Sequence, residues 1–134
     1  MIQIYTTPSC ASCRKAKKWF DQYNIPYSEK NIFSIKLSKK DIYKMLANSE
    51  NGFDDIISTR SKVFKEKHLE PDSMSVKDLV DFIIENPSVL KRPIIINENE
   101  LQVGYNNEDI TIFLPKELRN SEAFTGFEKE KTKK

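Results

Sequence analysis

A strand–helix–strand pattern at the N-terminus limits the fold of this chain more than any other feature. Ile2–Thr6 is a β-branched and aromatic run, which predicts a buried strand. Apolar residues then recur at helical spacing over Ala11–Tyr23, and an extended segment, Tyr27–Phe33, follows Pro26. Strand, helix and strand in this order are typical of two parallel strands joined by a crossover helix.

The rest of the chain predicts a helical segment followed by a hairpin. Ser38 and Ser75 are each placed to cap a helix, and Phe53–His68, between those helices, is typical of a broken helix. Gly52 is suited to end the helix that starts at Ser38, because glycine readily adopts the left-handed conformation. The remaining elements are two hairpin strands and a short last helix, over Arg92–Asn97, Leu101–Gly104 and Asn107–Leu114.

This order of elements matches a thioredoxin-like layout of the α/β class, in which a β-α-β part and a β-β-α part are split by a helical insert. The chain has 134 residues, of which 38% are hydrophobic, and this size suits one core. We expect a single domain over residues 1–119 with the insert at about residues 38–87. Residues 120–134, which end in "EKEKTKK", are expected to form a flexible tail.

Charge and hydropathy exclude several classes of protein. The formal net charge of +2 argues against a protein that wraps nucleic acid by bulk charge, although a local basic patch remains open. No apolar run approaches the roughly 20 residues that span a bilayer. The start of the chain lacks the charged and apolar regions of a signal peptide. We therefore expect a cytoplasmic protein without a membrane segment, where a permanent disulfide is uncommon.

Cys10 and Cys13 are the only cysteines, and they stand where the first helix begins. The free N–H groups of a helix start and the basic residues that follow favour a thiolate at Cys10. Cys13 lies one turn further along the same face, close enough to form a disulfide. This spacing beside a strand predicts a redox pair in which Cys10 is attacked first and Cys13 resolves it.

Other interpretations of the pair are weaker. A structural disulfide over so short a loop removes little entropy from the unfolded chain, roughly 2 kcal/mol. Zinc needs about four ligands, and the chain adds only His68, so a zinc site would have to be shared between two chains. Two inert buried thiols fit poorly with the turn residues around them. The residues alone do not choose between an enzyme and a sensor.

Five blocks of sequence together resemble the Spx and arsenate-reductase (ArsC-like) family over about residues 1–119. They are "YTTPSCASCRKAKKWF", "NIF", "DDIISTRSKVF", "RPIII" and "LQVGYNNEDITIFLP". The resemblance implies a global transcription regulator. We also expect the protein to be a monomer on its own, without a cofactor or metal. The resemblance further implies binding to the C-terminal domain of the RNA polymerase α subunit, contact with promoter DNA only within the polymerase complex, and control by an ATP-dependent protease with its adaptor.

The resemblance also assigns roles to particular residues. Cys10 and Cys13 match the cysteines whose disulfide switches the activating output on under thiol stress. Gly52 matches a glycine of the α-subunit interface. Arg92 matches an arginine beside the cysteines that holds the Cys10 thiolate or an anion, and Pro93 matches a cis-proline packed against the cysteine turn. Two further basic residues, expected to face the α subunit and promoter DNA, are Arg60 and Lys62.

Two departures concern the enzyme and the tail. Arsenate reductases of this family use one cysteine in this loop and a group of arginines that grip the oxyanion. Arg60 and Arg92 match two members of that group, but the remaining position falls in "LQVGY", which has no arginine. We therefore expect a regulator rather than an enzyme, with an arsenate-reductase-type thiol oxidoreductase as the alternative. The tail ends in lysines rather than in small apolar residues, which weakens the implied control by proteolysis.

Overall fold

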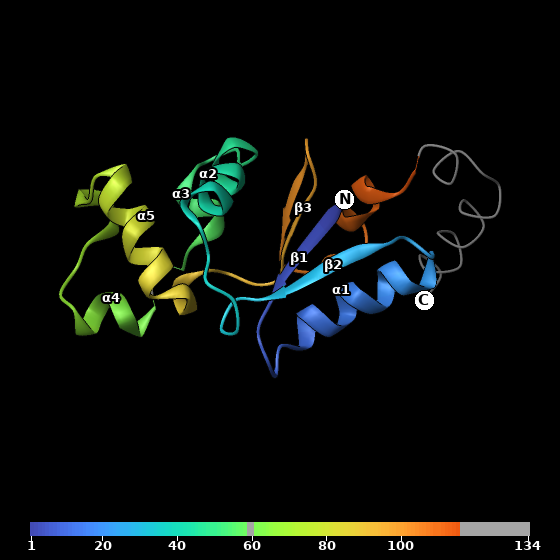
Figure 1. Cartoon of the computed structure of the whole chain (residues 1–134), viewed down its shortest axis with the longest axis horizontal. Helices are drawn as coiled ribbons and strands as arrows, with labels where there is room; N and C mark the ends of the chain where they lie inside the picture. Colours follow the sequence, from blue (N-terminus) through green and yellow to red (C-terminus); the bar gives the residue numbers. More distant parts are fainter. Residues whose placement is uncertain (59–60, 116–134) are drawn as a thin grey trace.

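A four-stranded mixed sheet crosses the middle of the molecule (Figure 1), of which the computed structural model describes residues 1–58 and 61–115. The strand order is β2-β1-β3-β4; β1 is parallel to β2 and antiparallel to β3, and β3 is antiparallel to β4. Helix α1 joins the parallel pair, which confirms the β-α-β unit. The bounds are β1 Ile2–Thr6, α1 Ala11–Gln22, β2 Tyr27–Asn31, β3 Ile94–Ile96 and β4 Leu101–Val103.

The two faces of the sheet carry separate hydrophobic clusters, because side chains alternate along each strand. On one face, Ile4 and Ile95 pack against α1 and the 3-10 helix η3 (Asp109–Phe113). Phe20 of α1 is fully buried in this cluster. On the other face, Tyr5 and the remaining β3 isoleucines pack against the helices that connect β2 to β3. The sheet therefore joins α1 to the helical part of the chain, which is the set of helices between β2 and β3 (Figure 1).

The helical part follows the capping signals of the sequence. Ser38 forms a capping box with Asp41 at the start of α2, and Ser75 accepts a hydrogen bond from the Asp78 backbone at the start of α5. The predicted broken helix is confirmed: it divides because Ile57 forms a β-bridge with Leu90. The elements are α2 Lys39–Ala47, α3 Phe53–Ile56, α4 Lys62–Glu66, η1 Pro71–Ser73, α5 Val76–Glu85 and η2 Pro87–Val89.

Gly52 does not end the helix that starts at Ser38, so this prediction is wrong. Helix α2 ends at Ala47, and polar side chains satisfy its last carbonyls: Asn48 donates to the Lys44 carbonyl and Ser49 to that of Leu46. Gly52 instead precedes α3, with φ 64° and ψ −132°. Glycine is required there because this backbone conformation disfavours a side chain.

Smaller differences concern the ends of elements. Strand β2 stops at Asn31, two residues before the predicted end, because the Asn31 side chain accepts the Phe33 N–H and starts a turn. The last predicted helix is present as a 3-10 helix. The boundary at residue 119 and the tail at residues 120–134 lie outside the described residues. Within the described part, no helix is long and apolar enough to cross a bilayer.

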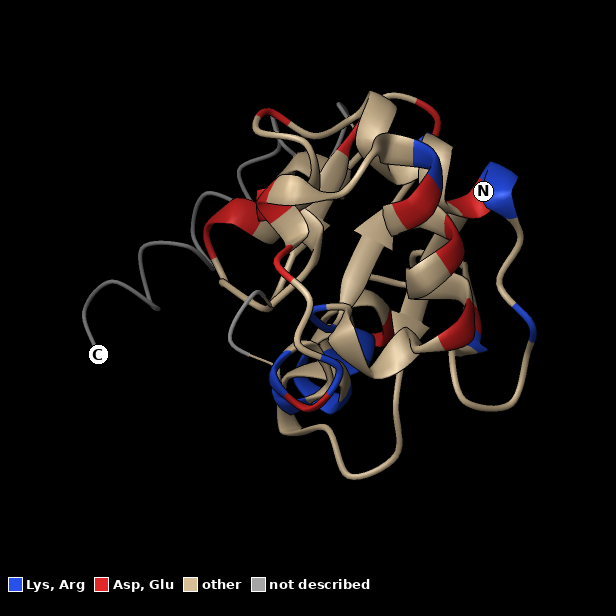
Figure 2. Cartoon of the chain, turned by 90° about the vertical axis from the view of Figure 1, so that its left-hand side faces the viewer, with Lys and Arg blue, Asp and Glu red and all other residues tan. Residues whose placement is uncertain are grey.

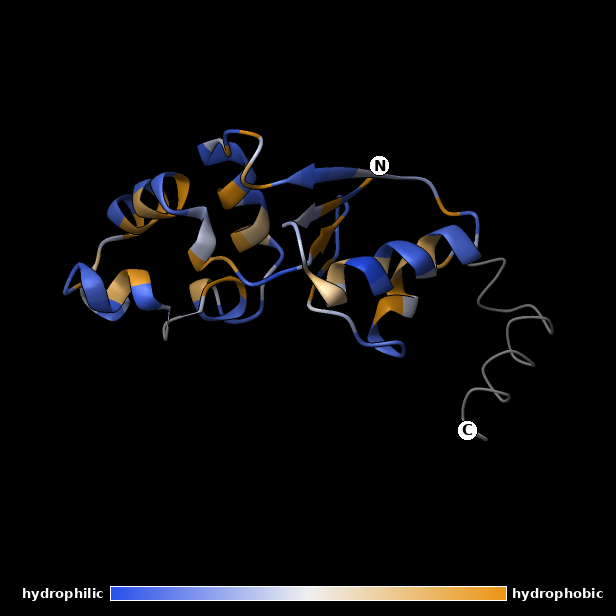
Figure 3. Ribbon diagram, turned by 90° about the horizontal axis from the view of Figure 1, so that it is seen from below, coloured by the Kyte–Doolittle hydropathy of each residue, from blue (hydrophilic) through white to orange (hydrophobic). Residues whose placement is uncertain are grey.

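Charges are unevenly distributed over this fold. Figure 2 views the molecule from the left-hand side of Figure 1 and shows Lys and Arg gathered most densely at the lower edge, while Asp and Glu lie mainly above. The view from below (Figure 3) shows hydrophilic and hydrophobic residues interspersed along the helices. A net charge of +2 therefore conceals regions of opposite sign.

Candidate redox site

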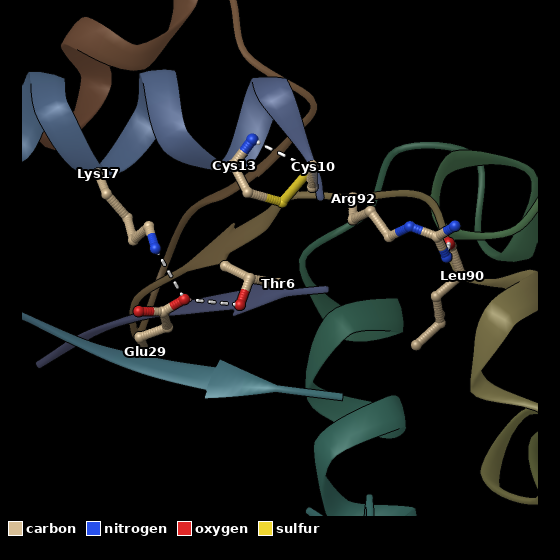
Figure 4. Close-up of a disulfide and its surroundings, with 7 residues drawn as sticks. All are labelled: Thr6, Cys10, Cys13, Lys17, Glu29, Leu90 and Arg92. Atoms are coloured by element: carbon tan, nitrogen blue, oxygen red, sulfur yellow. Dashed lines mark hydrogen bonds and ion pairs between the residues drawn. A yellow bond between two sulfur atoms is a disulfide. The ribbon is translucent and has the colours of Figure 1, made fainter. Parts of the chain in front are cut away.

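Cys10 and Cys13 form a disulfide at the start of α1 (Figure 4), with their Cα atoms 5.2 Å apart. Cys10 is the N-cap residue, and its Sγ accepts a hydrogen bond from the Cys13 backbone N–H at 3.1 Å. Ser9, with φ 62°, turns the chain from β1 into the helix. The sulfur of Cys10 thus occupies the position at which a helix start offers free N–H groups and a positive partial charge.

The two cysteines differ in their access to solvent. Cys13 is buried, with 2% of its surface exposed, whereas Cys10 is half-buried at the edge of the turn. The first turn of α1 carries no acidic residue, so nothing within that turn opposes a thiolate at Cys10. This asymmetry agrees with Cys10 as the residue attacked first and Cys13 as the resolving residue.

Lys17, one of the basic residues that follow the cysteines, is paired with a carboxylate of β2. Its Nζ lies 3.0 Å from Glu29 Oε2, and the same carboxylate oxygen accepts a hydrogen bond from Thr6 Oγ1 at 2.8 Å (Figure 4). Desolvation opposes the charge on Glu29, but the bonds from Lys17 and Thr6 still hold its pKa below the ordinary value. This contact ties α1 to both strands of the parallel pair.

Arg92 and Pro93 stand at the same end of the sheet as the cysteines, because β3 runs antiparallel to β1. The peptide bond between them is cis, as the resemblance implies. The guanidinium of Arg92 points away from the disulfide in Figure 4 and donates to the carbonyl oxygens of Ser88, at 3.1 Å, and Leu90, at 3.2 Å. It also lies 6.0 Å from the centre of the Phe33 ring. Contact of Arg92 with a reduced Cys10 therefore stays a prediction.

A polar contact between the sheet and the insert has no counterpart in the sequence-based predictions. Tyr5 on β1 donates its hydroxyl to Asp41 Oδ1 on α2 at 3.2 Å. Burial, then the charge of Asp41 and this hydrogen bond, raise the pKa of the Tyr5 hydroxyl. Burial opposes ionisation of Asp41, but bonds from Ser38, the charge of Lys30 and the bond from Tyr5 keep its pKa below the usual value. Only the helix cap at Ser38 was predicted from the sequence, because the pairing of Asp41 with Tyr5 depends on how the layers pack.

The remaining predicted site residues lie apart from the cysteines, in the helical part of the chain. Gly52 is half-exposed before α3, and Lys62 is exposed at the start of α4. Arg60 lies outside the described residues. His68 is exposed after α4, and the described residues hold no group of three or more Cys, His, Asp or Glu side chains that could bind a metal ion.

The match to known proteins covers most of the chain. The model of the ArsC family matches residues 5–113, which include both cysteines, the helical part and the hairpin. This chain belongs to the ArsC family. Within the family it is similar to the global transcriptional regulators Spx of Bacillus subtilis and Listeria innocua. It is 50% identical to the first over 120 residues, which cover 90% of this chain and 92% of that relative. It is also 50% identical to the Listeria innocua protein over 119 residues, which cover 89% of this chain and 91% of that relative.

Solved structures share the fold. The arsenate reductase from Vibrio cholerae superposes with a TM-score of 0.71 at 20% identity and covers 84% of this chain and 97% of that one. SACOL0876 from Staphylococcus aureus superposes with a TM-score of 0.73 at 19% identity, and the match covers 86% of this chain and 100% of that one. At these identities the match concerns the fold alone, and it confirms the predicted thioredoxin-like α/β class.

The difference in access between the two sulfurs predicts their reactivity. Two reduced single-cysteine variants are compared at pH 7: Cys13→Ser, which keeps Cys10, and Cys10→Ser, which keeps Cys13. We expect Cys10 to react with iodoacetamide at least about tenfold faster than Cys13, because Cys10 is accessible and placed to favour a thiolate, whereas Cys13 is buried. Mass spectrometry of timed samples gives both rates. In denaturant the two rates should become similar, and equal rates in the folded protein would contradict the assigned order of attack.

Proposed function

We propose that this ArsC-family protein is a cytoplasmic, redox-sensing transcription regulator. It binds the C-terminal domain of the RNA polymerase α subunit and changes promoter use under thiol stress through the Cys10–Cys13 disulfide. The observation that carries the proposal is this disulfide at the start of α1, in a chain half-identical to Spx regulators over most of its length.

Oxidation follows from the order of attack. The Cys10 thiolate attacks a peroxide and takes one oxygen as a sulfenic acid, while the other oxygen leaves as hydroxide or alkoxide. The Cys13 thiol then attacks the Cys10 sulfur, its proton passes to the leaving hydroxyl group, and water departs. The peroxide is reduced by two electrons and the two cysteines are oxidised to the disulfide. A dithiol reductant reverses the change by exchange.

Reduction would give the Arg92 guanidinium a new partner. In the disulfide state it is held by the carbonyls of Ser88 and Leu90. A Cys10 thiolate competes with these neutral acceptors, because a charge-assisted hydrogen bond is about twice as strong as a neutral one. Leu90 forms the bridge to Ile57, directly after α3, so movement of Arg92 would act on the segment that begins at Gly52. This route provides a physical link between the switch and the proposed interface.

The surface around Gly52 supports its assignment to the α-subunit interface. A Cβ atom added at Gly52 would meet no heavy atom within 4 Å, so the backbone is open to a partner. The exposed residues beside it include Glu50 and Asp54, which suit a partner with basic groups. The Asp55 carboxylate accepts the N–H groups of Glu50 and Asn51, both at 2.9 Å, and holds the turn in place.

Two further parts of the proposal rest on the resemblance to Spx-like proteins. Arg60 and Lys62 face the α subunit and promoter DNA, which is contacted only within the polymerase complex. The C-terminal tail is engaged by an ATP-dependent protease with its adaptor. Lys62 is exposed at the start of α4, which is compatible with this role.

Substitution of Gly52 tests the interface. We expect Gly52→Arg to abolish capture of the purified α C-terminal domain, because the side chain would fill the open approach. Gly52→Ala is the matched control: it introduces the same backbone strain, about 1–3 kcal/mol, without the bulk. It should keep binding within a few-fold of the wild type. Calorimetric titration measures both affinities. Absence of binding by the wild type would contradict the proposed interaction with the α subunit.

In vitro transcription tests the switch. With polymerase and a thiol-stress promoter, we expect the oxidised protein to activate transcription, while the reduced protein and Cys10→Ala activate several-fold less. The disulfide restricts the first turn of α1, and neither alternative form can reproduce that restriction. Equal transcript yields from the oxidised and reduced proteins, with the disulfide verified by mass, would show that the pair is not the switch.

An arsenate-reductase-type thiol oxidoreductase is the second candidate, favoured by the accessible Cys10 and by the shared fold. The segment Leu101–Tyr105 has no arginine to complete an oxyanion-binding site. Without this bidentate donor, the binding free energy of arsenate should be weaker by ~2 kcal/mol or more. We therefore expect no arsenate turnover above a Cys10→Ser control in a steady-state assay with thiol reductant. Clear turnover would instead establish the enzyme.

A further inference from the structure

Two helices that carry exposed basic residues, α1 and α4, lie on one side of the molecule. Both helices run along the lower side in Figure 1, and Figure 2 shows the density of Lys and Arg at that lower edge. Helix α1 lies along the sheet and α4 in the helical part, so they come from different halves of the fold. The exposed members of this basic face are Arg14, Lys15, Lys18, Lys62, Lys65 and Lys67.

The charges of this basic face are available to a partner. Among the described residues, none of its members forms an ion pair within 4.0 Å, whereas Lys17 of α1 is held by Glu29. The two helices carry few opposing charges, namely Asp21 on α1 and Glu66 on α4. Other acidic residues of the helical part lie on other elements, for example Asp54 on α3 and Asp72 on η1.

The arrangement suits a long polyanion better than a small anion. Arg14, Lys15 and Lys18 follow one another along α1 instead of converging on one point, and the α4 lysines stand on a separate element. A small phosphate could contact only one of the two groups. Duplex DNA carries a charge about every 1.7 Å along its axis, so one duplex could meet both helices.

We propose that α1, the redox helix, is a second element that contacts the phosphate backbone of duplex DNA beside α4. The inference rests on the proposed function, since a net charge of +2 is too small to hold DNA tightly without polymerase. Arg14 and Lys15 stand in the first turns after the Cys10 cap, so the disulfide also restricts the position of DNA-facing charges. The redox state thereby acts directly on the DNA contact as well as on the α-subunit surface.

The test measures how salt affects binding of a promoter fragment by the polymerase complex with the oxidised protein. Lys15→Gln/Lys18→Gln removes two charges from α1 while leaving Arg14, the basic residue next to Cys13, in place. We expect the slope of log affinity against log salt to fall by about 1.8, because each lost phosphate contact removes about 0.9. The loss should be similar on unrelated DNA sequences, since phosphate contacts carry no sequence information.

Lys40→Gln/Lys77→Gln is the matched control. These exposed lysines lie in the first turns of α2 and α5, outside the basic face, and their loss should leave the slope unchanged. An unchanged slope for the α1 variant, or an equal change for the control, overturns the inference. The inference is also overturned if the α1 variant binds polymerase more weakly than the wild type in the absence of DNA, because α1 would then contact protein instead of DNA. Failure of the wild type to join polymerase overturns the proposed function, and this inference with it.

Discussion

The placement of Cys10 at the N-cap of α1 is the constraint on which the proposed chemistry depends. Strand β1 ends at Thr6 and the helix begins at Ala11, so the chain must reverse within a short turn. That turn puts one sulfur at the helix start, where an N–H group donates to it, and the other beneath it in the core. The same backbone path creates the difference in access and the short separation that a disulfide needs.

Contacts around this turn connect it to the rest of the molecule. Glu29 links α1 to the parallel strands through Lys17 and Thr6, so the redox helix is anchored at its middle while its first turn carries the switch. On the other face of the sheet, Tyr5 reaches Asp41 and joins β1 to the helical insert. Both contacts involve neighbouring residues of β1, so the same strand connects α1 and the helical insert.

Much of the fold was predictable because its signals are local. The β-branched and aromatic run of β1, the helical spacing of Trp19 and Phe20, and the caps Ser38 and Ser75 each act within a few residues of their position. Gly52 was assigned to the wrong helix because a glycine indicates a turn without saying which element the turn belongs to. The capping of α2 by Asn48 and Ser49, two residues with weaker signals, decided that question.

The sequence by itself determined that a CxxC pair stands between a strand and a helix, with basic residues behind it, because these are neighbours along the chain. Only the tertiary structure decided which of those charges are paired within the described part of the chain: Lys17 is bound by Glu29 of β2, whereas Arg14, Lys15 and Lys18 are exposed. It also placed α1 and α4 on one side of the molecule. The physical reason is that ion pairs and shared surfaces form between residues distant in sequence, and packing of the sheet determines which of them meet.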